Sequence, residues 1–529
     1  MGSISANQHA EFDVIIVGAG LSGINAAYRV QTELPDYTYT ILESRNAIGG
    51  TWDLFRYPGI RSDSDLYTFG FPWRPWTETK AIADGTSIRN YIRECAEKFG
   101  IDRKIQFSNK LQASNWSTSE QRWELSVKQG NEGARSRKLK ARFVILSTGY
   151  YDYNQPLETK IPNLGAFKGQ TIHPQFWPEE LDYSNKKIII IGSGATAITL
   201  FPNLAEKAAS VTMLQRSPSY VLALPTVDPT GNMIRKVFPE WLSSRLIRWK
   251  FLVLPFLIFS FCRSFPNAAK KIMQRQMKQS LPADVPIDPH FNPSYNPWEQ
   301  RLCICPDGDF FDALQKQNTN IVTDTIQTVT ESGIITASGQ ELDADIIVTA
   351  TGLKMMFAGG AKLTVDKKPV ALNEKLLWKN TMIQDVPNAA VVVGYTNASW
   401  TLGSDTAALL MCRILKRMRR LNLTSAAPTL GSTFTSPHTN GHTKGDPEGK
   451  TEINGQLQTI DPQWHGMKTV SLLNLSSTYL EKAKGAIPKA GDRGPWRPRS
   501  NYFVDAWGAV FGNITRGLRF EGGEELKGR

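Results

Sequence analysis

The stretch FDVIIVGAGLSGINAAYRV, residues 12–30, decides the fold. Its run VIIV consists of branched apolar residues, which are typical of a buried parallel strand. Gly18, Gly20 and Gly23 follow in GxGxxG spacing and lead into an apolar helical pattern. The first glycine allows a tight turn, the second lets a pyrophosphate approach the backbone, and the third allows close packing of helix on strand. The sequence therefore predicts a Rossmann unit whose helix N-terminus faces phosphates.

An acidic residue supports this interpretation. A second strand pattern, YTYTILES at 37–44, ends in Glu43. In dinucleotide-binding units an acid about 20 residues beyond the glycines hydrogen-bonds a ribose hydroxyl. A glycine-rich turn without a ligand would not explain Glu43, so we expect a dinucleotide at the first unit.

The same pattern occurs a second time in KKIIIIGSGATAITL, residues 186–200. Here Gly192, Gly194 and Ala197 form the GxGxxA variant of the glycine pattern. The strand that follows, SVTMLQRSP at 210–218, has no acid at its end. The sequence therefore predicts a second Rossmann unit with a different ligand preference.

Arg216 and Ser217 stand where the first unit has its acid. A carboxylate would repel a 2′-phosphate, whereas a guanidinium can bind one in bidentate fashion. The second unit is therefore expected to prefer NADPH over NADH, and the first to hold FAD. The alternative for Arg216 is a solvated arginine at a strand end.

Two further strand patterns end in Thr-Gly pairs, VILSTGY at 144–150 and DIIVTATGL at 345–353. The second resembles the Ala-Thr-Gly motif of two-dinucleotide flavoproteins, which insert the NADPH domain within the FAD domain. We therefore expect an α/β fold with two Rossmann-like dinucleotide-binding domains, nested in this way, and a helical insertion. The expected boundaries are 1–150 and 353–529 for the FAD domain, 151–220 and 296–352 for the NADPH domain, 221–295 for the helical insertion, and 421–457 for a flexible segment rich in Ser, Thr, Gly and Pro.

Composition sets the broad class of protein. The chain has 529 residues, 41% hydrophobic and 21% charged, which is typical of a globular protein with two or three domains. The net charge is +12, and the basic residues are scattered without a zinc-finger or RNA-binding signature, so no nucleic-acid partner is expected. The charge serves either solubility or attraction to phosphates, of a dinucleotide or of a membrane surface.

Location is inferred from the cysteines and the apolar runs. Five cysteines make a sparse, odd set that does not form a disulfide framework, so we expect a cytoplasmic protein. The most apolar run, FLVLPFLIFSFC at 251–262, is interrupted by Pro255. It falls short of the ~20 residues that span a bilayer. It is interpreted as a core helix, as the lining of a substrate tunnel, or as a membrane-surface contact.

Two longer patterns carry a family resemblance. FKGQTIHPQFWP at 167–178 fits the FxGxxxHxxxW[P/D] signature of Baeyer–Villiger monooxygenases, and GGTWDLFRYPGIRSDSD at 49–65, hereafter the signature loop, fits their second signature. The chain resembles this family over about 11–420 and 476–506, and within it the ethionamide-activating branch. The resemblance implies that NADPH reduces FAD, that O₂ then gives a C4a-peroxyflavin, and that this species converts a small lipophilic ketone into an ester or lactone.

The resemblance also implies roles for individual residues. The catalytic arginine of the family corresponds to Arg301 in PWEQRLC, and the aspartate that orients it corresponds to Asp63 in the signature loop. A guanidinium remains protonated, so it can stabilise an anionic oxygen without losing a proton. No metal site is expected. The residues expected at the two cofactor sites are Gly18, Gly20, Gly23, Glu43, Gly50, Thr51, Trp52, Tyr57, Asp63, Gly192, Ser193, Gly194, Thr196, Arg216, Ser217, Thr351 and Gly352.

The chain departs from the family pattern at Gln300, where many members have a lysine that helps to bind the 2′-phosphate. His173 is expected to be structural, at the hinge between domains, rather than a proton-transfer base. Cys303 and Cys305 are expected to be buried thiols rather than a redox disulfide. The competing functions are a heteroatom oxygenase acting on thioethers or amines, and a non-catalytic dinucleotide-binding protein.

Overall fold

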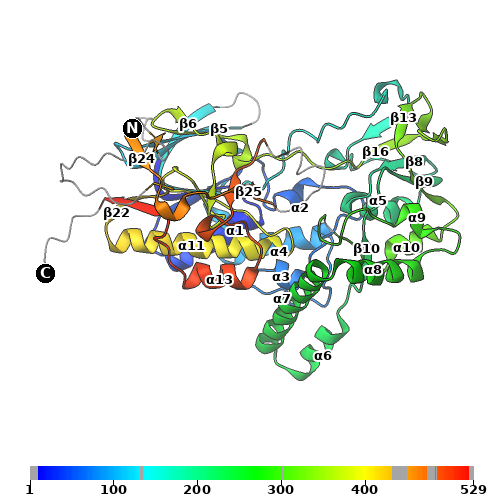
Figure 1. Cartoon of the computed structure of the whole chain (residues 1–529), viewed down its shortest axis with the longest axis horizontal. Helices are drawn as coiled ribbons and strands as arrows, with labels where there is room; N and C mark the ends of the chain where they lie inside the picture. Colours follow the sequence, from blue (N-terminus) through cyan, green and yellow to red (C-terminus); the bar gives the residue numbers. More distant parts are fainter. Residues whose placement is uncertain are drawn as a thin grey trace, which may run out of the picture.

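The computed structural model describes residues 10–130, 135–300, 302–431, 450–453, 456–473, 483 and 485–522. Figure 1 shows two α/β lobes side by side, with a group of helices along the lower side of the view. The lobe that contains the chain's first strand also contains its last helix. The polypeptide therefore builds one lobe, crosses to the other and returns.

The first lobe is built on an 11-stranded sheet. Its parallel part gives the Rossmann order, and its antiparallel part extends from the first half of the long strand β6. The parallel strands are β3 (Ile105–Gln106), β2 (Tyr39–Leu42), β1 (Ala10–Val17), β6 (Arg135–Leu146) and β21 (Ala389–Val391). The remaining strands are β5 (Arg122–Gln129), β4 (Asn109–Ser117), β17 (Lys362–Val365), β18 (Lys368–Pro369), β19 (Leu377–Trp378) and β20 (Met382–Ile383).

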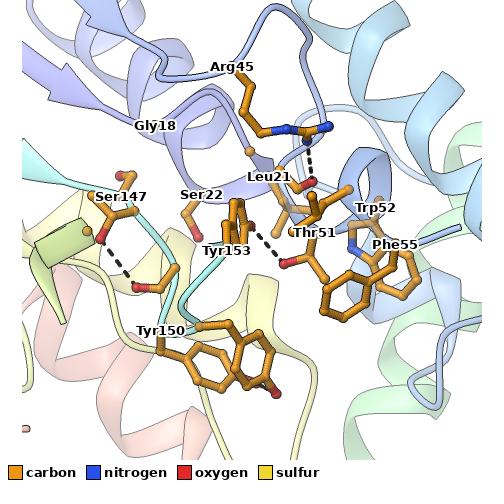
Figure 2. A pocket seen from close by; sticks show the side chains of 18 of the residues that line it. Gly18, Leu21, Ser22, Arg45, Thr51, Trp52, Phe55, Ser147, Tyr150 and Tyr153 are labelled. Atoms are coloured by element: carbon orange, nitrogen blue, oxygen red, sulfur yellow. Dashed lines mark hydrogen bonds between the residues drawn. The ribbon is translucent and has the colours of Figure 1, made fainter. Parts of the chain in front are cut away.

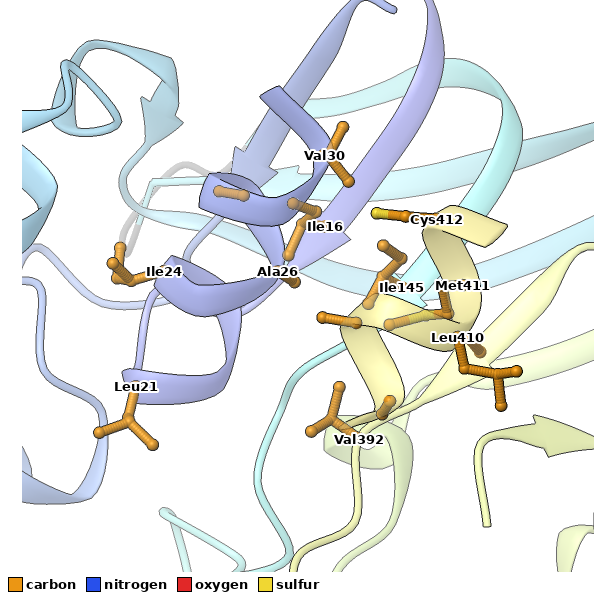
Figure 3. Close-up of a cluster of buried hydrophobic side chains, with 14 of the residues drawn as sticks. Ile16, Leu21, Ile24, Ala26, Val30, Ile145, Val392, Leu410, Met411 and Cys412 are labelled. Carbon is orange, nitrogen blue, oxygen red and sulfur yellow. The ribbon is translucent and has the colours of Figure 1, made fainter. Parts of the chain in front are cut away.

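Three helices accompany this sheet: α1 (Leu21–Glu33), α4 (Gly85–Lys98) and α11 (Trp400–Arg420). Figure 3 shows α1 and α11 with Ile16, Ile145 and Val392 of the sheet region packed between them. Arg29 of α1 forms a bidentate ion pair with Asp405 of α11, at 2.8 and 2.9 Å. The first glycine turn therefore rests on a rigid, doubly anchored helix.

The second lobe contains a five-stranded, all-parallel sheet. Its strands, in spatial order, are β12 (Thr319–Thr323), β9 (Ser210–Gln215), β8 (Lys187–Ile191), β16 (Ile346–Thr349) and β7 (Gln170–Ile172). Helices α5 (Ala195–Leu204) and α10 (Asp309–Leu314) pack on it, and an antiparallel unit of β13 (Ile326–Val329), β14 (Gly333–Thr336) and β15 (Glu341–Asp343) lies beside it. Both expected Rossmann units are thus present.

The predicted nesting of one unit within the other is confirmed. The chain leaves the first sheet after β6 and returns after β16. The two crossing segments run antiparallel, with a bridge between Tyr151 and Met355, and the N–H of Asp152 donates to the carbonyl of Lys354 at 2.8 Å. The two lobes are therefore joined by a paired double connection.

The helical insertion comprises α6 (Pro229–Val237), α7 (Glu240–Ser264), α8 (Pro266–Ser280) and the short α9 (Ile287–His290). Pro255, which interrupts the apolar run, lies inside α7, and the helix continues through it to Ser264. Proline removes one backbone donor from a helix, and the turns on both sides of Pro255 persist. None of the described helices is long and apolar enough to cross a membrane.

The C-terminal part returns to the first lobe. Strand β22 (Leu423–Pro428) pairs with β27 (Leu518–Gly522), and α13 (Tyr502–Val510) packs beside α11. The expectation of a flexible segment over 421–457 is wrong at its start, because 425–428 are buried against that partner strand. Residues 432–449 and 454–455 of that segment lie outside the described residues. The remaining strands are β10 (Val221–Leu224), β11 (Cys303–Pro306), β23 (Lys450–Ile453), β24 (Gln456–Thr459), β25 (Thr469–Ser471) and β26 (Lys489–Gly491).

Candidate functional site

The first glycine turn is shaped by close backbone packing. Gly18 has φ +104°, and a Cβ built there would lie 2.6 Å from the carbonyl oxygen of Ser147. A Cβ at Gly23 would lie 1.8 Å from the carbonyl oxygen of Gly18. Within the described part of the chain, no side chain caps α1 at Gly20. The first N–H groups of α1 are thus available to a phosphate, as predicted.

Glu43 lies at the end of β2 and is 6% exposed. Its carboxylate accepts hydrogen bonds from the backbone N–H of Ala19 at 2.7 Å and of Arg45 at 2.8 Å. Burial raises the pKa of Glu43, and these two donors act in the opposite direction. The carboxylate is therefore held in place beside the glycine turn, where a ribose would need it.

The signature loop contains a helical turn that sequence periodicity did not predict. Helix α2 (Thr51–Leu54) occupies its first part, and α3 (Leu66–Phe69) follows its last residue. One turn is too short to show a 3.6-residue period. Figure 2 shows Thr51 and Tyr153 facing each other, and their hydroxyls are 3.0 Å apart. Arg45 donates to the carbonyl of Gly50 at 3.2 Å, which holds the start of the loop against β2.

A cavity of about 600 Å³ lies between these elements. That volume is within the range of ~300–1,000 Å³ that is typical of cofactor sites. Of the residues predicted from sequence, it is lined by Gly18, Gly20, Glu43, Gly50, Thr51, Trp52, Tyr57, Asp63 and Thr196. The cavity reaches α5 through Ala195, Thr196 and Thr199, so residues of both nucleotide units contribute to one space.

Aromatic side chains form much of the cavity wall. Trp52 packs edge-on against Phe69, with ring centroids 5.6 Å apart, and Tyr150 stacks on Trp400 at 4.5 Å. Tyr150, Tyr153, Trp400 and Arg45 were not predicted as site residues. Tyr150 directly follows the Ser-Thr-Gly end of β6, which is a local signal that could have identified it, whereas Trp400 reaches the cavity only through the tertiary fold.

The second half of the signature loop packs on the other nucleotide unit. The Tyr57 hydroxyl hydrogen-bonds Thr196 in the first turn of α5, and burial is the main reason that the pKa of Tyr57 lies far above its usual value. A Cβ at Gly59 would lie 2.0 Å from Nδ2 of Asn203. Arg61 forms an ion pair with Asp309 at the start of α10. The loop therefore connects the two lobes.

The predicted catalytic pair is described only in part. Asp63 lines the cavity, and its charge contributes to raising the pKa of Tyr57. Arg301 lies outside the described residues, although Leu302 beside it is buried and β11 follows. The pairing of Asp63 with Arg301 stays a prediction.

The second glycine turn repeats the geometry of the first. Gly192 has φ +135°, and a Cβ there would lie 2.4 Å from the carbonyl oxygen of Ala350. No described atom beyond its chain neighbours lies within 4 Å of a Cβ built at Gly194. Ser193 donates to the carbonyl of Ser217 at 2.9 Å, and Arg216 is exposed at the end of β9. The second unit thus presents an open face at the position predicted for NADPH.

Thr351 and Gly352 lie outside the cavity lining, on the returning crossing segment. Thr351 accepts a hydrogen bond from Thr159 at 3.0 Å, and the carbonyl of Gly352 accepts one from Nε2 of His173 at 3.2 Å. Burial lowers the pKa of His173. His173 therefore joins the 167–178 signature to the crossing segment.

The five cysteines, all within the described part of the chain, are buried free thiols. Cys303 contacts the carbonyl of Ser193 at 3.8 Å, and burial raises the pKa of Cys305 to about 12. The expected buried thiols are confirmed, and Cys303 and Cys305 form no disulfide.

The cavity fits a flavin dinucleotide. It combines an uncapped helix N-terminus, a fixed carboxylate at the ribose position and flat aromatic surfaces, which match a pyrophosphate, a ribose and a ring system. The glycines at positions 18 and 20 also leave space where a Cβ would intrude. Gly18, Gly20 and Glu43 all line this cavity.

Comparisons with known proteins agree with this geometry. Residues 16–84 match the NAD(P)-binding Rossmann-like domain, and residues 75–249 match the flavin-binding monooxygenase-like family. The FAD-containing monooxygenase EthA of Mycolicibacterium smegmatis is 42% identical over 93% of this chain and 94% of its own length. EthA of Mycobacterium tuberculosis is 40% identical over 96% of this chain and 97% of its own length.

Solved structures of similar fold support the architecture. An oxidised steroid monooxygenase bound to NADP superimposes with a TM-score of 0.66 at 19% identity, over 79% of this chain and 88% of the other. A cyclohexanone-bound cyclohexanone monooxygenase gives a TM-score of 0.65 at 19% identity, over 80% and 90% of the two chains. At 19% identity, these two structures show only that the fold is shared.

Proposed function

The chain belongs to the family of FAD-containing monooxygenases, and on that premise we propose that it is an NADPH-dependent Baeyer–Villiger monooxygenase. It would insert one oxygen atom from O₂ beside a ketone carbonyl and give an ester or lactone. One observation carries the proposal: a single cavity is lined by the Gly18 turn of the first nucleotide unit and by the first turn of α5 in the second. A hydride donor held by the second unit can thus reach a flavin held by the first.

The chain's own residues would hold the two cofactors in different ways. The α1 N-terminus and Glu43 hold the FAD diphosphate and ribose, while Arg216 and Ser217 hold the 2′-phosphate of NADPH. When bound, the flavin accepts electrons from NADPH and activates O₂ for transfer. The aromatic wall of Trp52, Phe69 and Trp400 excludes water from this space and favours a lipophilic substrate.

The signature loop would assemble the oxygenation site. Its Arg61 is paired with Asp309, which lies shortly after β11, so the loop and the segment that carries Arg301 in sequence are held together at this point. A guanidinium at Arg301 would stabilise the negative charge that develops on the substrate oxygen, and Asp63 would orient it. Tyr57, which remains protonated because of its raised pKa, would keep the loop against Thr196.

A second candidate is oxygenation of sulfur or nitrogen on the same scaffold. It is favoured because the relatives at 40–42% identity are named only as FAD-containing monooxygenases, without a ketone substrate. A non-catalytic role is disfavoured, because both glycine turns are intact and residues of both nucleotide units line one cavity.

The test is product analysis with FAD-loaded protein, NADPH and isotopically labelled O₂ on a panel of ketones and thioethers. The proposal expects esters that carry one labelled oxygen. Arg301→Ala should lower ester formation by ~10²–10³-fold, while FAD content is kept and NADPH oxidation continues with release of H₂O₂. Sulfoxides without any ester would favour the second candidate, and full ester yield from Arg301→Ala would remove that residue from the mechanism.

A further inference from the structure

Helices α6, α7 and α13 lie along the lower side of the molecule in Figure 1. Large apolar side chains point outward from all three helices. Trp241, Trp249 and Leu257 of α7 are 62%, 58% and 55% exposed, and Trp507 and Phe511 at α13 are 67% and 65% exposed. We call this surface the apolar face. Contiguous exposure of this kind is rare on soluble proteins and indicates an interaction site.

The apolar face includes a row of exposed positions on α7. Positions 241, 245, 249, 253, 257 and 261 are all exposed, and Arg245 is the one charged residue among them. Because a spacing of four exceeds the helical repeat of about 3.6 residues, this row winds slowly around the helix. On α13 the exposed positions 504, 507 and 511 share one side of the helix. Trp249 stacks on Phe503 at 6.1 Å, which makes the two rows continuous.

The exposed row is not needed to attach α7 to the protein. The opposite side of α7 performs that task, with Ile247 and Cys262 buried. Arg248 donates to the carbonyls of Tyr67 and Gly70 at 2.6 and 2.8 Å, which fixes α7 on α3. The outward row therefore remains available for another partner.

Charge identifies the kind of partner. Residues 229–280, which contain α6, α7 and α8, have ten Lys or Arg and one acid, Glu240. This segment thus accounts for +9 of the chain's net charge of +12. Lys271, Arg275 and Lys278 of α8 are exposed. Trp, Phe and Leu beside clustered Lys and Arg are the composition of helices that lie in a membrane interface.

We propose that the apolar face docks peripherally on an anionic lipid bilayer. The aromatic and aliphatic side chains would enter the headgroup boundary, and the basic residues of the helical insertion would lie near the lipid phosphates. A second copy of the chain is a poorer occupant, because a twofold contact would bring two segments of charge +9 against each other. The proposal does not depend on the reaction that the enzyme catalyses.

The experiment is cosedimentation of the full-length, FAD-loaded protein with vesicles of phosphatidylcholine alone and of phosphatidylcholine with phosphatidylglycerol. Binding is expected to the anionic vesicles and to fall in high salt, which shortens the range of charge interactions. Lys271→Glu/Lys278→Glu/Arg275→Glu should weaken partitioning by roughly 100-fold or more, from about a factor of five per lost charge. The triple variant Trp241→Ser/Leu257→Ser/Trp507→Ser should also weaken partitioning to the vesicles, although it changes no charge.

Two control variants test whether binding depends on the apolar face itself or only on the net charge and on exposed aromatic residues in general. Lys362→Glu/Lys367→Glu/Lys368→Glu changes the net charge equally on β17–β18, and Phe107→Ser removes an exposed aromatic elsewhere. Both should bind vesicles like the unmodified protein. The proposal is overturned if the unmodified protein stays in the supernatant, if the control and face variants lose binding equally, or if the serine variant instead dissociates a dimer in light scattering.

Discussion

The two glycine turns have a similar backbone conformation, but different atoms lie around their second glycines. A Cβ at Gly18 would meet the carbonyl of Ser147 at 2.6 Å, and one at Gly192 would meet that of Ala350 at 2.4 Å. At the second glycine the units differ: a Cβ at Gly20 would lie 3.5 Å from Cα of Gly50 in the signature loop, whereas at Gly194 no described atom beyond the chain neighbours is within 4 Å.

The residues at the ends of β2 and β9 also differ in their exposure. Glu43 is buried and fixed by backbone donors, while Arg216 is exposed. The signature loop thus closes on the second glycine of the first turn but not on the second glycine of the other turn, while its later residues pack on α5 and α10. This difference is what an oxidoreductase needs if one dinucleotide is kept through many turnovers and the other is exchanged in each.

A large effect on FAD binding is expected from filling the covered turn. Gly20→Leu should place a side chain between the turn and Gly50, where overpacking costs about 1–3 kcal/mol, or roughly 5–150-fold in FAD affinity. The measurement is flavin absorbance per protein after purification, with circular dichroism to check folding. Gly194→Leu is the matched control and should keep its flavin. Equal flavin loss in both variants would break the comparison.

The next effect concerns the open unit. Arg216→Ala should remove one charged contact to the 2′-phosphate, at a cost of about 1.5–3 kcal/mol, or roughly 10–150-fold in NADPH affinity. Anaerobic flavin reduction at varied coenzyme concentration measures it. The apparent Kd for NADH should change little, and Arg216→Lys should recover part of the loss. A parallel loss for both coenzymes would exclude the 2′-phosphate role.

A smaller effect is expected where the loop joins the two units. Tyr57→Phe deletes the hydrogen bond to Thr196, worth about 1 kcal/mol, or roughly fivefold. It should appear as weaker NADPH binding with unchanged FAD content. Thr196→Val should do the same, and the double variant should be little worse than either, because the two groups form one interaction. Additive losses would indicate that the residues act separately.

The smallest effect concerns the crossing segments. Burial lowers the pKa of His173 below its ordinary value of 6.5, so the unfolded chain binds the proton more readily than the folded one. Stability should therefore decrease as the pH falls below about 6.5, since protonation of Nδ1 also breaks its bond from the N–H of Gln175. Thermal unfolding of His173→Gln against pH should show a shallower acid slope. An unchanged slope would contradict this.

Sequence reasoning succeeded where the signal is local. Buried strand runs followed by spaced glycines predicted both Rossmann units, and the resemblance of 345–353 to the Ala-Thr-Gly motif of two-dinucleotide flavoproteins predicted their nesting. It failed where the tertiary fold supplies the burial or the contact. Strand β22 has a weakly apolar sequence and is stabilised by β27 from the end of the chain, and Trp400 enters the cavity from the N-terminus of α11. The single turn of α2 is shorter than any helical period.

The central claim is that the covered unit keeps FAD while the open unit exchanges a 2′-phosphorylated coenzyme. Its most direct test is calorimetric titration of dialysed, FAD-loaded protein with NADP⁺ and with NAD⁺, followed by assay of free flavin. The account predicts that flavin stays bound and that NADP⁺ binds roughly tenfold or more tightly than NAD⁺, from one charged contact. Equal affinities, or release of FAD as either coenzyme binds, would contradict it.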